Sequence, residues 1–240
     1  MREHFLSQDT AAVGEPVWRF PGQQATVTFT LLADDIVCIA LTPHGASPHR
    51  TWAVEPESNA RRASTFAIMQ DDDSSFVVRT PMLTLSIEPQ TGVFSIAQAD
   101  GAPICAQAHL GSAPGEQRCS MPLAESARFF GGGERTGSLN KRGRTLTFWA
   151  KDALPHFNEQ TDAMYQSVPF LIQLVQGQVS GLFFDSNWHA TADIGEQEPD
   201  MLSYVTSGPD LVIYVCAGPT FADVLRQYSS ITGHMPPQPR

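Results

Sequence analysis

The chain has 240 residues, of which 42% are hydrophobic and 17% charged, so it can bury a sizeable core and should be globular. Its 15 basic and 25 acidic residues give a net charge of −10, which argues against a nucleic-acid partner because phosphate binding needs a concentrated basic surface. The sequence has neither a signal-peptide pattern nor an apolar run of about 18 residues, so we expect a cytoplasmic protein without a membrane partner. The acidic net charge is compatible with a neutral or polyhydroxylated ligand.

Residues 1–23 are interpreted as a polar, Pro-containing N-terminal extension, and short β-strands separated by turns begin at Gln24. The alternating segment "ATVTFTLLA" turns at Asp34-Asp35 into "IVCIALTP", which predicts a hairpin. The segment "LTLSIEPQTGVFSIAQADGAPICAQA" predicts three strands, broken at residues 89–92 and at Asp100-Gly101. Because these strands are short and regularly spaced, they favour a β-sandwich.

The strand pattern continues beyond the middle of the chain. "SVPFLIQLVQ" and "VSGLFFDS" flank a turn at Gln176-Gly177, and "MLSYVTS" and "LVIYVCAG" flank Gly208-Pro209. The fold class predicted for residues 24–219 is therefore a mostly β, antiparallel β-sandwich.

The segment "TFADVLRQYSSITG" is the one helical pattern. Apolar residues recur at helical spacing at Phe221, Val224, Leu225, Tyr228 and Ile231. Thr220 is the expected N-cap, with Asp223 three residues on, and Gly233 ends the helix. The Pro-rich "HMPPQPR" follows, so residues 220–240 are interpreted as a helix and a stiff linker.

The cysteines and histidines predict neither a metal site nor a cofactor. The cysteines lie far apart without a CxxC pair, which favours buried, reduced thiols at Cys38, Cys105, Cys119 and Cys216. The seven histidines are scattered and form no HExxH motif, and either His156 or His189 fits a surface position.

The stretch "FFGGGERTGSLNKRGRTLTFWAKD" at residues 129–152 is the densest candidate motif. A dinucleotide fingerprint fails because its third glycine position is Thr136, and a P-loop fails because Ser138 occupies the lysine position. The strand pattern of "RTLTFWA" also replaces the helix that both motifs require. Residues 131–144 are therefore predicted to be a bent strand and loop, in which Glu134 pairs with a basic neighbour.

Carboxylates are the candidate residues for sugar chemistry. A glycosidase needs two carboxylates facing each other across a sugar, and the candidates are Asp152, Glu159, Asp162, Asp185 and Asp193. Sequence alone places no two of them together. Asp152 follows an aromatic strand end, and its carboxylate suits either two sugar hydroxyls or the cap of a turn before Leu154-Pro155.

Several motifs occur in a fixed order in the second half of the chain: "GGGERTGS", "FWAKDA", "MYQSVPFLIQL", "SGLFFDSNW" and "GPTFADVLRQYSSITGHMPPQP". This order resembles the N-terminal region of glycoside hydrolase family 31, the α-glucosidase family. The resemblance is dense from about Ser126 to Pro239 and looser from Gln24 to Ala108. It implies a galactose mutarotase-like sandwich that packs against a (β/α)₈ barrel, where the two catalytic carboxylates of a retaining mechanism reside.

By motif match the resemblance makes Asp152 a substrate-binding residue that contacts the sugar from a loop over the barrel mouth, and it makes Glu134 and Arg135 structural. The family's nucleophile motif, of the W-x-D-M-N-E type, does not occur here. The expectation is therefore a domain without its own catalytic residues. Its expected partner is an α-glucoside or malto-oligosaccharide, bound together with the barrel. Whether the chain is a piece of a longer protein or the product of a split gene stays open.

Two other functions remain as alternatives. A stand-alone carbohydrate-binding module would bind maltose without a barrel. A mutarotase-like epimerase would need a His and a Glu as acid and base, and no such pair is marked out. An apolar docking face exposed without its barrel would also favour a homodimer.

Overall fold

The computed structural model describes residues 16–46, 51–55, 66–70, 75–153 and 158–234. Its strands form two antiparallel sheets and are accompanied by one helix, α1 (Phe221–Thr232). The first sheet has seven strands in the order β1 (Val17–Pro21), β2 (Ala25–Ala33), β3 (Ile36–Pro43), β16 (Leu211–Gly218), β13 (Gln178–Phe184), β12 (Ser167–Val175), β10 (Arg128–Gly133).

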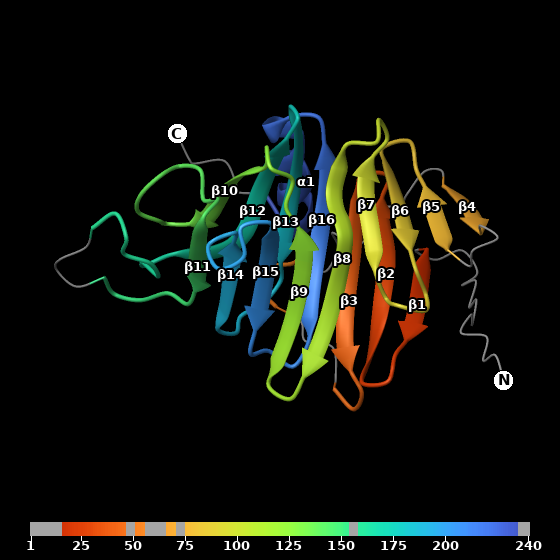
Figure 1. Ribbon diagram of the computed structural model, residues 1–240, viewed down its shortest axis with the longest axis horizontal. Helices are drawn as coiled ribbons and strands as arrows, with labels where there is room; N and C mark the ends of the chain where they lie inside the picture. The colour runs from red at the N-terminus through yellow and green to blue at the C-terminus, as the bar shows by residue number, and fades with distance from the viewer. Residues whose placement is uncertain (1–15, 47–50, 56–65, 71–74, 154–157, 235–240) are drawn as a thin grey trace.

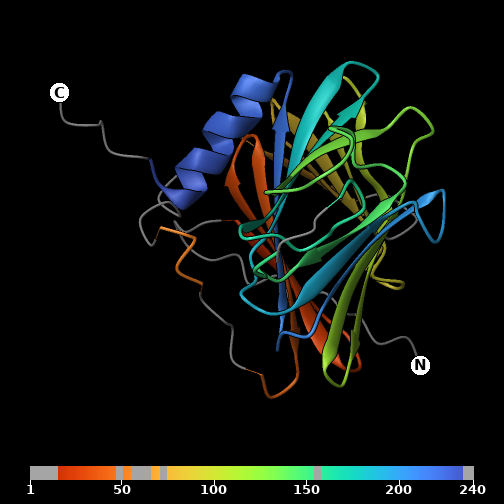
Figure 2. The same cartoon turned by 90° about the vertical axis from the view of Figure 1, so that its left-hand side faces the viewer.

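The second sheet has nine strands, and the two sheets lie face to face as layers (Figures 1 and 2). Its order is β11 (Arg144–Phe148), β14 (Ala190–Ile194), β15 (Met201–Thr206), β9 (Glu116–Pro122), β8 (Pro103–Ala113), β7 (Phe94–Gln98), β6 (Leu83–Ile87), β5 (Phe76–Arg79), β4 (Ala67–Gln70). The predicted antiparallel β-sandwich with one C-terminal helix is confirmed.

The main core fills the space between the sheets, because alternate residues of each strand point inward. Phe29 of the first sheet meets Phe94 of the second at a ring-centroid distance of 5.3 Å. Phe184 stacks on Tyr204 at 3.9 Å in the same way. Aromatic pairs that span the two layers fix the sheets against each other.

A second apolar cluster lies on the outer face of the first sheet, where α1 covers β13 and β16 (Figure 2). Phe183 belongs to this cluster, whereas its neighbour Phe184 belongs to the main core. The predicted helix caps are confirmed: the Thr220 hydroxyl accepts a hydrogen bond from the Asp223 backbone N–H, and Gly233 follows the last turn with φ +88°. The helix buries Val224 and Ile231, while Phe221 stays half exposed.

The predicted hairpins β2–β3 and β12–β13 and the run of strands β6, β7 and β8 are confirmed. Two features differ. Strand β1 lies within residues 1–23, so part of that predicted extension pairs with β2 in the sandwich. The strands around Gly208-Pro209, β15 and β16, belong to different sheets, because alternation encodes which face is buried and not which strand is the neighbour.

None of the four cysteines forms a disulfide bond, as predicted; Cys105, Cys119 and Cys216 are buried and Cys38 is partly buried. Burial raises the pKa of the Cys119 thiol to about 12. The predicted Pro-rich linker at residues 235–240 lies outside the described part of the chain, as does His156. Within the described ranges, no helix is long and apolar enough to cross a membrane.

Candidate functional site

Strand β10 ends in a bend made by three consecutive glycines. Its pairing with β12 shifts register between Gly131 and Gly133, which is a β-bulge. All three glycines have positive φ, and a Cβ added at Gly131 would lie 2.5 Å from the Phe170 carbonyl oxygen. Glycine is required here because the backbones of β10 and β12 approach too closely for a side chain. The predicted bent strand is confirmed.

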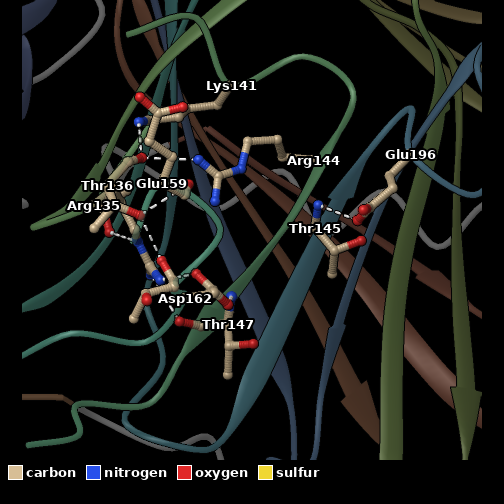
Figure 3. A network of polar contacts seen from close by, with 11 residues as sticks. Arg135, Thr136, Lys141, Arg144, Thr145, Thr147, Glu159, Asp162 and Glu196 are labelled. Atoms are coloured by element: carbon tan, nitrogen blue, oxygen red, sulfur yellow. Dashed lines mark hydrogen bonds and ion pairs between the residues drawn. The ribbon is translucent and has the colours of Figure 1, made fainter. Parts of the chain in front are cut away.

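Arg135, just beyond the bend, is the centre of a group of contacts that we call the Arg135 cluster (Figure 3). Its guanidinium donates to the Gly132 carbonyl at 2.9 Å and to the Thr147 carbonyl at 2.7 Å. It forms an ion pair with Asp162 and lies 5.1 Å from the Phe148 ring centroid. The side chain of Arg135 is only 3% exposed, so the cluster ties the bend, strand β11 and residue 162 together in a desolvated setting.

The prediction that Glu134 pairs with a basic neighbour is wrong for Arg135. The carboxylate that pairs with Arg135 is that of Asp162. The Asp162 carboxylate also accepts the Thr147 backbone N–H. Glu134 itself has an exposed side chain. Sequence could not reveal this because Asp162 is 27 residues away from Arg135.

The loop between the bend and β11 is held by backbone carbonyls. The buried Lys141 ammonium donates to the Ser138 carbonyl at 2.6 Å. Arg144 donates to the Thr136 carbonyl at 2.8 Å (Figure 3). Burial, followed by the charges of Arg144 and Arg135, lowers the pKa of Lys141. These cations serve the loop's own backbone, which agrees with the failure of the phosphate motifs.

Asp152 lies four residues beyond the end of β11, and its side chain is exposed. The backbone on both sides of it is pinned. The Lys151 N–H donates to the Met164 carbonyl at 3.0 Å, and the Tyr165 hydroxyl donates to the Ala153 carbonyl at 3.1 Å. We call this region the Asp152 loop, meaning residues 149–153 and 158–165. It presents a carboxylate to solvent from an anchored backbone.

Two exposed aromatic side chains, Trp149 and Tyr165, belong to the Asp152 loop. Trp149 is 49% exposed, and its ring contacts that of His189 at 5.9 Å. Tyr165 is 53% exposed; desolvation and the neighbouring Asp152 carboxylate raise the pKa of its hydroxyl. Leu139, from the loop before β11, is 76% exposed. A carboxylate on the same loop as two exposed aromatic rings is a setting in which a sugar can be hydrogen bonded and stacked.

Most of the other candidate carboxylates hold structural contacts, and Glu159 and Asp162 line one shared surface pocket. Asp162 belongs to the Arg135 cluster, and Asp193 accepts the Glu196 N–H at 2.8 Å in a turn. Asp185 accepts the Thr51 hydroxyl, while Glu159 has an exposed side chain in the Asp152 loop. Among the described residues, no group of three His, Cys, Asp or Glu side chains is placed to hold a metal ion.

Sequence reasoning missed two residues at the same end of the second sheet. Trp188 is 46% exposed, and Gln117 is buried with an amide oxygen that has no hydrogen-bond donor among the described residues. Both line a cleft that is described below. The residue Trp188 could have been noticed as an aromatic side chain in the polar segment "DSNWH", but Gln117 carries no local pattern.

Comparison with known proteins gives consistent results. Residues 26–193 match the family described as the glycosyl hydrolase 31 N-terminal galactose mutarotase-like domain. Alpha-glucosidase 2 of Bacillus thermoamyloliquefaciens is 31% identical over 232 residues, covering 94% of this chain and 29% of that protein. Alpha-xylosidase XylQ of Lactiplantibacillus pentosus is 29% identical over 117 residues, covering 49% of this chain and 14% of that protein.

Solved structures share the fold. A GH31 dextranase of Flavobacterium johnsoniae, solved with isomaltotriose, superposes with a TM-score of 0.80 at 20% identity, covering 92% of this chain and 28% of the dextranase. A GH31 alpha-xylosidase from a soil metagenome, solved with xylose, gives a TM-score of 0.71 at 15% identity, covering 92% of this chain and 34% of the xylosidase. The chain thus spans about a third or less of the length of each of these relatives.

Proposed function

Because the chain belongs to the family of glycosyl hydrolase 31 N-terminal galactose mutarotase-like domains, we propose that it acts as the non-catalytic domain of an α-glucosidase-type glycosidase. In this proposal Asp152 contacts the substrate sugar. The observation that carries it is the exposed Asp152 carboxylate on a backbone pinned at Lys151 and Ala153. The carboxylate interacts with the neighbouring Tyr165 hydroxyl and is otherwise open to solvent, so it can accept further hydrogen bonds from a ligand.

The chemistry would be divided between two domains. A catalytic barrel would supply the nucleophile and the acid/base carboxylate of a retaining double displacement. Asp152 would accept hydrogen bonds from sugar hydroxyls, which are stronger when the acceptor is ionised. Its contribution would be to position the sugar, because holding a reactant in the reactive geometry lowers the barrier without a bond being made or broken.

The exposed side chains of Leu139, Trp149 and Tyr165 favour a docking surface around Asp152. In the proposal a catalytic barrel covers this surface. A homodimer through the same surface is the alternative, and sedimentation of this chain at high concentration distinguishes the two. A dimer that persists after Leu139→Ser would mean that another surface pairs the copies.

The test is a chimera in which this chain replaces the corresponding N-terminal region of the Bacillus alpha-glucosidase 2. We expect Asp152→Ala to lower kcat/KM for an α-glucoside by about tenfold to a hundredfold, the size expected when one charged contact to the substrate is lost. The matched control is Asp200→Ala, which removes another exposed carboxylate. An Asp152→Ala chimera with unchanged kcat/KM would refute the contact.

The same proposal predicts that this chain alone does not hydrolyse a chromogenic α-glucoside during a long incubation. Turnover by the chain alone that disappeared in Asp152→Ala would overturn the division of labour. Two catalytic carboxylates would then have to lie within the 240 residues.

A further inference from the structure

A cleft of about 600 Å³ opens at the end of the sandwich where the β8–β9 hairpin lies, at the lower edge in Figure 1 and away from α1. This volume is in the range of small-molecule sites. The cleft lies between the ends of the two sheets, and the residues that line it include His44, Ser112, Gln117, Trp188, Ser207 and Gly208. None of the described residues that line it is Asp, Glu, Lys or Arg.

Gln117 provides an unpartnered buried polar atom in this cleft. It is the second residue of β9, and only 3% of it is exposed because it alternates inward with Cys119 and Met121. Its amide nitrogen donates weakly to the Ala113 carbonyl at 3.5 Å, whereas Oε1 has no donor among the described residues. A buried acceptor without a donor is costly, and a ligand hydroxyl in the cleft would relieve that cost.

Trp188 provides an aromatic surface in the same cleft. Its backbone N–H donates to the Ser186 hydroxyl at 3.2 Å. Its ring packs closely over Gly208, where a Cβ would come within 2.9 Å of the indole Cδ1. The absence of a side chain at Gly208 therefore lets the indole approach the chain closely, and Trp188 still remains 46% exposed.

The side chains that line the cleft indicate which class of ligand it can bind. The Gln117 amide, the Ser112 and Ser207 hydroxyls and the His44 imidazole offer hydrogen bonds. A nucleotide or other anion would find no cation here, and a protonated amine would find no carboxylate. A neutral ring with hydroxyls at its edge and C–H bonds on its face fits both the uncharged lining and the indole.

We propose that this cleft, the Gln117 cleft, is a second carbohydrate site that binds a pyranose unit of a neutral oligosaccharide. The apolar face of the sugar packs on Trp188, and a sugar hydroxyl donates to Gln117 Oε1. The site is separate from Asp152. The second sheet runs β11, β14, β15, β9, and three strand spacings of about 4.8 Å place β9 about 14 Å from β11.

Both sites lie at the same end of that sheet. Phe148 at the end of β11 pairs with Ala190, which pairs with Thr206 at the end of β15, and Thr206 pairs with Gln117. An oligosaccharide longer than one or two sugars can therefore extend along this edge between the two sites. The choice of an α-glucan as the probe rests on the proposed function, whereas the existence of a neutral-sugar site does not.

The test is an NMR titration of this chain with maltotriose and, separately, with isomaltotriose. We expect saturable binding with shifts at the Trp188 indole and the Gln117 amide, and an affinity loss of about tenfold or more in Trp188→Ala and in Gln117→Leu. Trp52→Ala is the matched control, since Trp52 is fully exposed outside the cleft and its loss should leave the affinity unchanged. Sorbitol, a polyol without a ring, should bind much more weakly.

Stability separates a lost contact from a lost fold. Gln117→Leu removes an unpartnered polar group, so its unfolding midpoint should equal or exceed that of the wild type. If that variant does not fold, the exposed Trp188 carries the test alone. Absence of binding by the wild-type chain, binding that survives Trp188→Ala, or equal binding of sorbitol would each overturn the proposal.

Asp152→Ala distinguishes this proposal from the proposed function. Maltotriose should still shift the Trp188 indole and Gln117 amide signals in a saturable way in that variant, while the chimera should lose kcat/KM. A chimera unaffected by Asp152→Ala, combined with intact binding at Gln117 and Trp188, would refute the Asp152 contact and keep the second site. A chimera that loses kcat/KM in Asp152→Ala, combined with no binding at Gln117 and Trp188, would refute the second site and keep the Asp152 contact.

Discussion

Arg135 and Asp152 lie within one stretch of 24 residues, residues 129–152, yet their charged groups are used in opposite ways. The Arg135 guanidinium is 3% exposed and contacts two backbone carbonyls and one carboxylate. The Asp152 side chain is exposed; the backbone on either side of it is held, and its carboxylate has the exposed Tyr165 hydroxyl as a neighbour.

The difference separates structural residues from residues available to a ligand. A buried charge must be paired inside the fold, because an unpaired one lowers the free energy of unfolding by its desolvation cost. A charge that is exposed costs the fold little and keeps its acceptors for another molecule. Substitutions in the cluster should therefore change the free energy of unfolding, whereas substitutions of Asp152 should change ligand contact.

The largest expected effect is that of Asp162→Ala. It leaves the buried Arg135 without its ion pair and the Thr147 N–H without its acceptor, so the free energy of unfolding should fall by about 3 kcal/mol or more. Urea unfolding of this chain measures the change. Asp200→Ala is the control, with an expected change within about 0.5 kcal/mol. Equal effects for the two substitutions would contradict a structural role for the cluster.

The next effect is that of Gly131→Ala, compared with Gly143→Ala. Both glycines have positive φ, but a Cβ at Gly131 meets the Phe170 carbonyl at 2.5 Å and one at Gly143 meets nothing within 4 Å. We expect losses of about 3 kcal/mol at Gly131 and about 1 kcal/mol at Gly143, also by urea unfolding. If both cost the same, the left-handed backbone alone explains the glycines, and the close approach of β10 to β12 does not matter.

These residues also show what the sequence could and could not predict. The bend at Gly131 and the strand at Thr145 to Phe148 follow from local rules, since glycine permits positive φ and alternation marks a strand. Thr220 and Gly233 as helix caps follow from equally local chemistry. The family motifs added the order of the elements and the position of Asp152.

Long-range pairings could not be predicted in the same way. The partner of Arg135 is 27 residues distant, and Gln117 lies in the cleft with Trp188 only because β9 pairs with β15. The strand β1 escaped notice because "VWRFP" is too short to show alternation clearly and contains a proline. In each case several partners satisfy the local pattern, and packing decides among them.

A smaller effect is expected from Tyr165→Phe. The hydroxyl that donates to the Ala153 carbonyl is lost, but the side chain is half exposed, so the free energy of unfolding should fall by only about 0.5 kcal/mol. In the chimera, kcat/KM should fall severalfold if Tyr165 positions Asp152. The control is the same substitution in the Asp152→Ala background, where Tyr165→Phe should have no further effect on kcat/KM. A full additional loss there would give Tyr165 a role of its own.

The smallest effect on stability should come from Asp152→Ala, and this makes it the sharpest test of the comparison. Because the exposed carboxylate does not hold the fold, its removal should change the free energy of unfolding by less than about 0.5 kcal/mol, measured by urea unfolding beside Asp162→Ala. A loss close to that of Asp162→Ala would mean that the carboxylate caps a turn before Leu154-Pro155, which is the structural alternative that the sequence left open. Unchanged stability together with a lower kcat/KM in the chimera would not fit a turn cap, because the loss of a cap should lower stability. That result would support a direct contact between Asp152 and the sugar.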